Sequence, residues 1–94
     1  MINLEWSTEK AEANLKKHGV TFDEASTIFR DPLSITSDDP DHTVSERRYL
    51  AFGVSLIGRS LVVSYTVRSD TIRLISARLM TSQERRKYEQ HRQR

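Results

Sequence analysis

The first twenty residues change from a strand-like to a helix-like spacing of apolar side chains. Residues 2–6 alternate between apolar and polar side chains, which predicts a short strand. Residues 8–18 have a helical composition, with Ser7 placed to cap the first turn and Gly19 placed to end the helix. The chain is therefore expected to pass from a strand almost directly into a helix.

A second helix is predicted immediately after Gly19. Thr21 and Glu24 have the spacing of a capping box, in which a hydroxyl and a carboxylate each satisfy a free backbone N–H. Apolar residues then repeat at helical spacing: Phe22, Ala25, Ile28 and Phe29. The dipeptide Asp31-Pro32 should end this helix, because a residue before proline avoids the α conformation.

The rest of the chain has shorter apolar runs, which predict strands and one final helix. Strands are predicted at residues 33–36, 47–55, 61–67 and 71–79, a loop at 37–46, and a polar helix at 82–94. Both faces of 71–79 are largely apolar, so this strand is expected to be central, with Arg73 and Arg78 leaving on opposite faces. The order β-α-α-β-β-β-β-α predicts an α+β fold with a small antiparallel sheet, two N-terminal helices and one C-terminal helix.

Length and composition narrow the class of protein. The 94 residues, 36% hydrophobic and 30% charged, predict one domain over residues 1–94 with a modest core. The absence of cysteine excludes disulfides, thiol chemistry and cysteine-based zinc sites. No apolar run reaches membrane-spanning length, and the N-terminus lacks a signal-peptide core. We therefore expect a cytoplasmic protein without a membrane partner.

Charge is divided unevenly along the chain. Residues 1–46 carry four Lys/Arg and ten Asp/Glu, whereas residues 68–94 carry eight Lys/Arg and three Asp/Glu. Residues 47–67 add three arginines and no acid. This asymmetry indicates a polyanionic partner for the basic half, although the two halves could also neutralise each other within one fold.

The basic half contains a candidate phosphate site. Arg68, Arg73 and Arg78 lie five residues apart, and Arg85, Arg86 and Lys87 follow in the last helix. A guanidinium group can donate two parallel hydrogen bonds to the oxygens of one phosphate. These side chains are therefore expected to converge on one hollow. Tyr65 and Tyr88 could stack on unpaired bases. The alternative is that each arginine pairs with a carboxylate of this chain or lies on a solvated helix face.

Cleavage of RNA without a metal also requires groups that move protons. Arginine cannot do this at ordinary pH, so the base and the acid must come from other side chains. The candidates are His18, His42, Glu46, Tyr65 and Tyr88. His18 is placed at a helix C-terminus, where it could serve catalysis or simply cap the helix. Asp38, Asp39 and Asp41 lack the spacing of a calcium loop, which indicates a solvated turn.

Several runs together resemble the BrnT family of small ribonuclease toxins. They are EWSTEKAEANLKKHGVTFDEA, ERRYLAFG, LVVSYTVR and IRLISARLMTSQERRKYE. The resemblance runs from residue 3 to 89, apart from a variable loop at 33–45. The resemblance implies a RelE-like fold, endoribonuclease activity without a metal or other cofactor, and growth inhibition through RNA cleavage. It also implies a BrnA-like ribbon-helix-helix antitoxin as partner, with operator DNA bound only through that antitoxin.

The resemblance and the residue types together define a candidate site. The proposed catalytic residues are His18, Glu46, Arg68, Arg78 and Arg85. The proposed RNA-binding residues are Lys17, Arg48, Tyr65, Arg73, Arg86 and Tyr88, and no metal ligand is expected. Many relatives carry an acid where this chain has Val67. This leaves open an alternative, a non-catalytic binding module that acts as co-repressor within an antitoxin–DNA complex.

Overall fold

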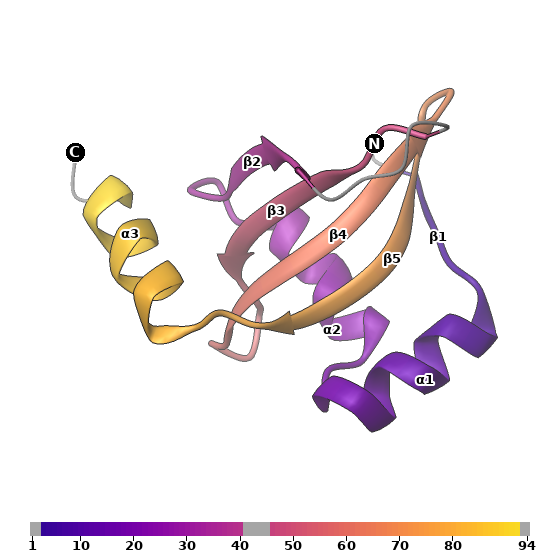
Figure 1. The fold of residues 1–94 in the computed structure, drawn as a ribbon, viewed down its shortest axis with the longest axis horizontal. Coiled ribbons are helices and arrows are strands. Elements are labelled where there is room, and N and C mark those ends of the chain that lie inside the picture. The colour runs from indigo at the N-terminus through magenta and orange to yellow at the C-terminus, as the bar shows by residue number, and fades with distance from the viewer. Residues whose placement is uncertain (1–2, 41–45, 93–94) are drawn as a thin grey trace.

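A computed structural model of the chain describes residues 3–40 and 46–92 (Figure 1). Five strands form one sheet in the order β1-β5-β4-β3-β2. In chain order the elements are β1 (Asn3–Glu5), α1 (Thr8–His18), α2 (Phe22–Ser26), the 3-10 helix η1 (Thr27–Arg30), β2 (Ile35–Asp38), β3 (Tyr49–Val54), β4 (Ser60–Arg68), β5 (Thr71–Leu79) and α3 (Ser82–Arg92). The predicted α+β class and the predicted order of helices and strands are confirmed. Within the described residues, no helix is long and apolar enough to cross a membrane.

The predicted caps of the two N-terminal helices are present. Ser7 Oγ accepts a hydrogen bond from Lys10 N at 3.2 Å, and Thr21 Oγ1 accepts one from Glu24 N at 3.0 Å. Gly19 ends α1 in the left-handed conformation at φ 70°, where a side chain would be strained. These ends depend on neighbouring residues alone, which is why the sequence predicts them.

The second helix is shorter than predicted. It is α-helical only to Ser26 and then tightens into η1. The hydroxyls of Ser26 and Thr27 donate to the carbonyls three residues earlier, those of Asp23 and Glu24, at 2.7 Å each. Such local bonds compete with the regular helical pattern, so they account for the change to a 3-10 turn.

The sheet differs from the prediction at both edges. The strand predicted at residues 33–36 lies at Ile35–Asp38, so it extends into the segment expected to be a loop. At the other edge, β1 pairs with β5 in parallel, which makes the sheet mixed rather than wholly antiparallel. The strand 71–79 pairs with this three-residue edge strand on one side and with β4 on the other, so it is an interior strand, as predicted, although β4 is the middle one. Edge pairing depends on distant segments, so local patterns do not predict it.

A register shift in β5 places its arginines differently from the prediction. Tyr65 pairs with Leu74 and Ser64 pairs with Ser76, so Ile75 is an extra residue, a bulge. Because of this bulge, Arg73 opposite Thr66 and Arg78 opposite Val62 point to the same face of the sheet. The prediction that the two arginines leave on opposite faces is therefore wrong, since it assumed an unbroken alternation.

The helices α2 and η1 cover one face of the sheet, with the core between them and the strands, and α1 lies along the β5 edge. The buried residues of this core are Val20, Phe22, Ala25, Ile28, Ala51, Leu61, Val63, Tyr65, Leu74 and Ala77. Gly53 lets η1 approach β3, because a Cβ there would lie 3.2 Å from the Cβ of Ile28. Figure 1 views the sheet from its other face, which these helices leave open.

Candidate functional site

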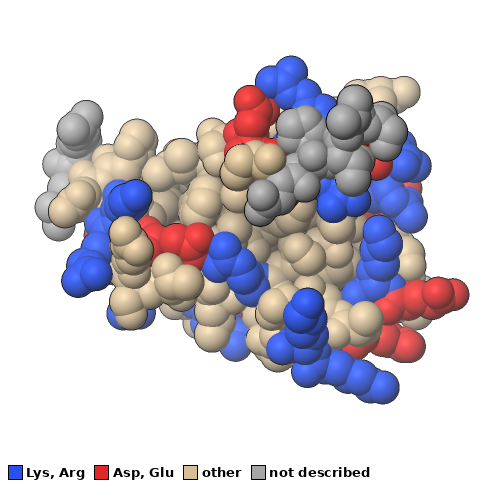
Figure 2. All heavy atoms as spheres, in the orientation of Figure 1, with Lys and Arg blue, Asp and Glu red and all other residues tan. Residues whose placement is uncertain are grey.

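The open face of the sheet has an uncharged middle and a basic border. By register, Leu50, Ser64 and Ser76 form one row across three strands, and Phe52, Val62 and Arg78 form the next. Figure 2 shows this face, with Lys and Arg side chains gathered along its margins. The fold therefore concentrates positive charge around a surface that the helices leave uncovered.

A hollow of about 370 Å³ lies where this face meets α1, and we call it the α1 hollow. Its lining residues are Lys10, Ala13, Asn14, Lys17, His18, Arg48, Ile75 and Ser76. Four of these residues are basic and none is Asp or Glu. A hollow with this lining suits an anion, because its cations are not neutralised by acids of the same lining.

Asn14 fixes α1 against the sheet at this hollow. Its side chain is 6% exposed, and its Nδ2 donates to the carbonyl oxygens of Ala77 at 2.8 Å and Val20 at 3.0 Å. Its Oδ1 accepts from the N–H of Ala77 at 3.0 Å. The carboxamide thus pairs with β5 as a neighbouring strand would, and it sets the position of Lys10 and Lys17, which lie on the same side of α1.

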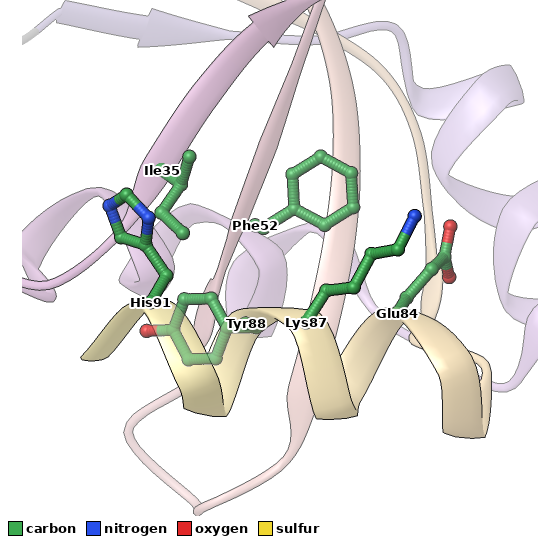
Figure 3. A pocket seen from close by; sticks show the side chains of 6 residues that line it. All are labelled: Ile35, Phe52, Glu84, Lys87, Tyr88 and His91. Carbon is green, nitrogen blue, oxygen red and sulfur yellow. The ribbon is translucent and has the colours of Figure 1, made fainter. Parts of the chain in front are cut away.

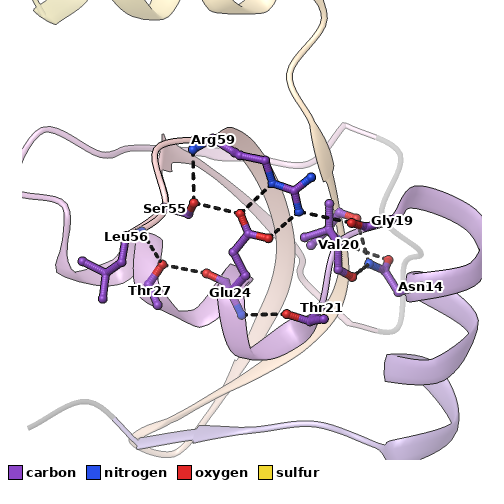
Figure 4. Close-up of polar contacts among 10 residues, drawn as sticks. Asn14, Gly19, Val20, Thr21, Glu24, Thr27, Ser55, Leu56 and Arg59 are labelled. Carbon is purple, nitrogen blue, oxygen red and sulfur yellow. Dashed lines mark hydrogen bonds and ion pairs between the residues drawn. The ribbon is translucent and has the colours of Figure 1, made fainter.

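A second set of bonds holds the C-terminal end of α1 (Figure 4). Arg59 forms an ion pair with Glu24, and its Nη2 donates to the carbonyl of Gly19 at 3.1 Å. Ser55 Oγ donates to Glu24 Oε2 at 2.8 Å. Arg59, as the main hydrogen-bond donor, lowers the pKa of Glu24, so the carboxylate stays ionised. The turn that follows His18 is therefore tied to the β3–β4 hairpin.

Arg48 enters the α1 hollow with an unsatisfied donor. Its Nε is buried and has no hydrogen-bond partner within residues 3–40 and 46–92. An unpaired buried donor costs free energy, and it shows that no acid of the described residues holds this end of the guanidinium. Arg48 is thus the strongest single indication of a ligand in this hollow.

Glu46 lies close to Arg48 but bonds another arginine. Its Oε1 accepts from Arg68 Nε at 3.2 Å and Arg68 Nη2 at 3.0 Å. Arg68 lowers the pKa of Glu46, and the charge of Arg48 lowers it further. The carboxylate therefore remains ionised near neutral pH beside the hollow.

The predicted phosphate arginines do not converge on one hollow. Each is paired with a carboxylate: Arg68 with Glu46, Arg73 with Glu5, Arg78 with Glu84, and Arg85 with Glu89 at the limiting distance of 4.0 Å. None of them lines the α1 hollow. The expectation of a shared cradle assumed that the acidic and basic halves of the chain would stay apart, whereas the fold brings them together. Arg86 is exposed on α3.

The two tyrosines are not placed to stack on bases. Tyr65 is 7% exposed in the core, with its ring stacked on Tyr49 at 5.5 Å, and burial raises its pKa. Tyr88 is 3% exposed, and its hydroxyl donates to Asp31 Oδ2 at 2.7 Å. Both rings are largely covered by protein, although Tyr88 contributes to the lining of a hollow beside α3.

The histidines fall in three different places. His18 lines the α1 hollow, as expected for a residue at the end of α1. His91 lines a separate hollow beside α3. His42 lies outside the described residues. Within the part of the chain that the structure describes, no three His, Asp or Glu side chains are grouped as metal ligands.

Sequence reasoning missed three polar residues that line this site, Lys10, Asn14 and Ser76. Asn14 carries a weak signal, because asparagine is a poor residue for a helix interior and needs a reason to be there. Ser76 carries none, because its orientation depends on the bulge at Ile75. The roles of Asn14 and Ser76 could not be predicted, because they depend on contacts with segments distant in the sequence.

These features describe a small α+β protein with a basic, partly hollowed sheet face, and sequence comparison identifies its family. The family described as "Ribonuclease toxin, BrnT, of type II toxin-antitoxin system" matches residues 6–84, so the chain belongs to the BrnT family. The 1.1 Å crystal structure of the Brucella abortus ribonuclease toxin BrnT is similar in fold, with a TM-score of 0.63 and 18% sequence identity. The match covers 87% of this chain and 100% of that one. No curated protein sequence matches.

Proposed function

We propose that this chain is an endoribonuclease toxin that inhibits growth by cleaving RNA in the cytoplasm, with a BrnA-like antitoxin as its neutralising partner. Family membership supports the reaction class, since the family is one of ribonuclease toxins in type II toxin–antitoxin systems. The observation that carries the proposal is the α1 hollow, where Arg48 has a buried donor without a partner. A scissile phosphate of RNA is the anion we assign to it.

The proposed reaction uses side chains of this chain. A base takes the proton of the RNA 2′-hydroxyl, whose oxygen attacks the phosphorus, and the 5′-oxygen leaves with a proton from an acid. The products are a 2′,3′-cyclic phosphate and a 5′-hydroxyl. Lys17 and Arg48 stabilise the added charge on the phosphorane.

Proton transfer is assigned to His18 and Glu46. His18 is the one imidazole among the residues that line the α1 hollow, and imidazole is the side chain most often used for general acid–base catalysis. Glu46 is the second group: Arg68 lowers its pKa, so it is present as a carboxylate and can act only as a weak proton acceptor. Arg68, Arg73, Arg78, Arg85 and Arg86 are assigned to phosphates on either side of the cleaved one. Arg68, Arg73, Arg78 and Arg85 would do so by exchanging their carboxylate partners.

The test compares His18→Ala and Arg48→Ala with Arg30→Ala. Arg30 is exposed on η1, which packs on the opposite face of the sheet, so this control removes one charge away from the site. We expect both site variants to lose about 100-fold or more in RNA cleavage rate and to relieve growth arrest. Arg30→Ala should cleave like the wild type. If His18→Ala and Arg48→Ala both retain full cleavage while folded, the α1 hollow is not the catalytic site.

The ion pairs of the arginines favour a second candidate function, a binding module without catalysis. The ion pairs of Arg68, Arg73 and Arg78 reduce the charge available to RNA on the open face. A non-catalytic module that acts with its antitoxin on operator DNA would need no free phosphate site. A purified chain that leaves RNA intact, yet increases operator affinity of its antitoxin, would establish this second function instead.

A further inference from the structure

A second hollow lies at the other end of the open face, between the sheet and α3 (Figure 3). We call it the α3 hollow, and its volume is about 400 Å³. Its lining residues are Ile35, Phe52, Glu84, Lys87, Tyr88 and His91. None of these residues lines the α1 hollow, so the two are separate sites.

The α3 hollow is on the same face of the sheet as the α1 hollow. Phe52 pairs with Val62, and Leu50 pairs with Ser64, so β3 presents Phe52 and Leu50 to the open face. Arg48 precedes Phe52 by four residues on the same side, which places the two about 13 Å apart along the strand. An extended RNA strand with one phosphate at Arg48 would thus reach the α3 hollow with a neighbouring nucleotide.

The walls of the α3 hollow are held in place from both sides. Tyr88 anchors the middle of α3 through its bond to Asp31 Oδ2, and that oxygen also accepts from Val54 N at 2.9 Å. Arg78 holds the first turn of α3 through two bonds to Glu84, at 2.8 and 2.9 Å. This polar helix is therefore held at two points, Tyr88 and Glu84, and the hollow lies between it and the ends of β2 and β3.

The chemistry of the lining fits a nucleobase. Phe52 and Ile35 offer an aromatic ring and an aliphatic side chain, which suit the face of a flat aromatic ligand. Lys87 and His91 supply donors at the rim, and Glu84 supplies acceptor oxygens for an exocyclic amino group. Figure 3 shows Phe52 and Ile35 facing the side chains that α3 contributes.

We propose that the α3 hollow binds one base of a single-stranded RNA whose neighbouring phosphate lies in the α1 hollow, so that Phe52 and α3 set base preference. This inference rests on the proposed function. An apolar side chain of a protein partner is the rival occupant. RNA is favoured because the Lys87 ammonium lies at the rim of the hollow and because the hollow shares the open face with Arg48.

The experiment is an abasic scan read by binding. The His18→Ala chain, which should not cleave, is titrated with short labelled single-stranded RNAs in which one nucleotide at a time lacks its base. We expect one position to cost tenfold or more in affinity, since stacking of a base on an aromatic ring has this magnitude. When the His18→Ala chain also carries Phe52→Leu, removal of the base at that position should lower the RNA affinity threefold or less.

Lys87→Ala, combined with His18→Ala, is a second test by the same abasic scan. This substitution changes an exposed side chain and leaves the packing of Phe52 intact. It should weaken the same position, whereas Arg30→Ala should leave the scan unchanged. The base site is overturned if no abasic position lowers affinity more than the others. It is also overturned if neither Phe52→Leu nor Lys87→Ala changes the scan in folded protein. Both conclusions hold even if the wild type cleaves RNA. Loss of antitoxin binding with an unaltered scan assigns the hollow to the protein partner and also overturns it. If the wild-type chain neither binds nor cleaves RNA, the proposed function is wrong, and the base site that rests on it is wrong as well.

Discussion

At the scale of single residues, Asn14 links the stability of the fold to the geometry of the α1 hollow. Its carboxamide makes three hydrogen bonds that no apolar residue can replace, two to Ala77 and one to Val20. We predict that Asn14→Leu lowers the free energy of unfolding by about 2–3 kcal/mol, because it leaves these buried backbone groups unpaired. Urea unfolding monitored by circular dichroism measures this loss.

Lys16→Leu is the matched control for Asn14→Leu. Lys16 is exposed on the same helix, so the same new side chain there should change the free energy of unfolding by less than about 0.5 kcal/mol. Equal stabilities for the two variants would show that the Asn14 bonds contribute no net stability. A folded Asn14→Leu protein should also bind RNA less tightly, since Lys10 and Lys17 lose their fixed position.

At the scale of elements, the sequence predicts those features that depend only on residues near one another in the chain. The caps at Ser7 and Thr21 are where the capping patterns place them, because each involves residues within one helical turn. Thr81 Oγ1 likewise accepts from Glu84 N at the start of α3. The bulge at Ile75 has no local signal, because it becomes visible only when β5 is paired with β4. One residue of register decides whether Arg73 and Arg78 share a face, so this part of the site could not be predicted from sequence.

The helix α3 gives a pH prediction. Arg78, as the main hydrogen-bond donor, lowers the pKa of Glu84 to about 2 from its ordinary value of 4.5. A carboxyl group with a lowered pKa in the folded state stabilises the fold above its unfolded pKa, and this contribution is lost as the pH falls through the folded pKa. The Glu84 contribution is therefore complete above about pH 4.5 and is lost toward pH 2.

Glu84→Gln measures that contribution. Glutamine preserves the capping box with Thr81 but not the charge. We expect the variant to be about 1–2 kcal/mol less stable than the wild type at pH 7, a modest value because the Arg78 side chain is 40% exposed. The difference should shrink as the pH falls from 4.5 toward 2. Glu89→Gln, at an exposed pair with a 4.0 Å separation, should show almost no difference at any pH. A Glu84→Gln deficit that is constant with pH would contradict the assignment.

At the scale of the whole molecule, the fold redistributes the charge asymmetry seen along the sequence. Acids from the first half pair with arginines from the second, as Glu5 does with Arg73 and Glu46 with Arg68. The first half in turn supplies Lys10, Lys17 and His18 to the α1 hollow. Sequence reasoning thus named three residues that line this hollow, Lys17, His18 and Arg48, but the arginines that it placed together in a phosphate cradle are each paired with an acid.

This redistribution makes the salt dependence of RNA binding a test of the whole arrangement. For single-stranded RNA, the logarithm of affinity falls with the logarithm of salt concentration by about 0.7 for each neutralised phosphate. If RNA is held mainly by the permanently charged residues of the α1 hollow, namely Lys10, Lys17 and Arg48, the slope should be about −2. Contacts from all eight basic residues of 68–94 would instead give about −5 or steeper.

The substitution that separates these cases is Arg48→Ala, measured with His18→Ala to prevent cleavage. We expect it to reduce the slope by about 0.7, because one phosphate contact is lost. Arg30→Ala, on the opposite side of the sheet, should leave the slope unchanged although it removes the same charge. A steep slope that is insensitive to Arg48 would mean that the acid-paired arginines exchange partners and hold the RNA. The phosphate site would then lie along β5 and α3 rather than beside α1.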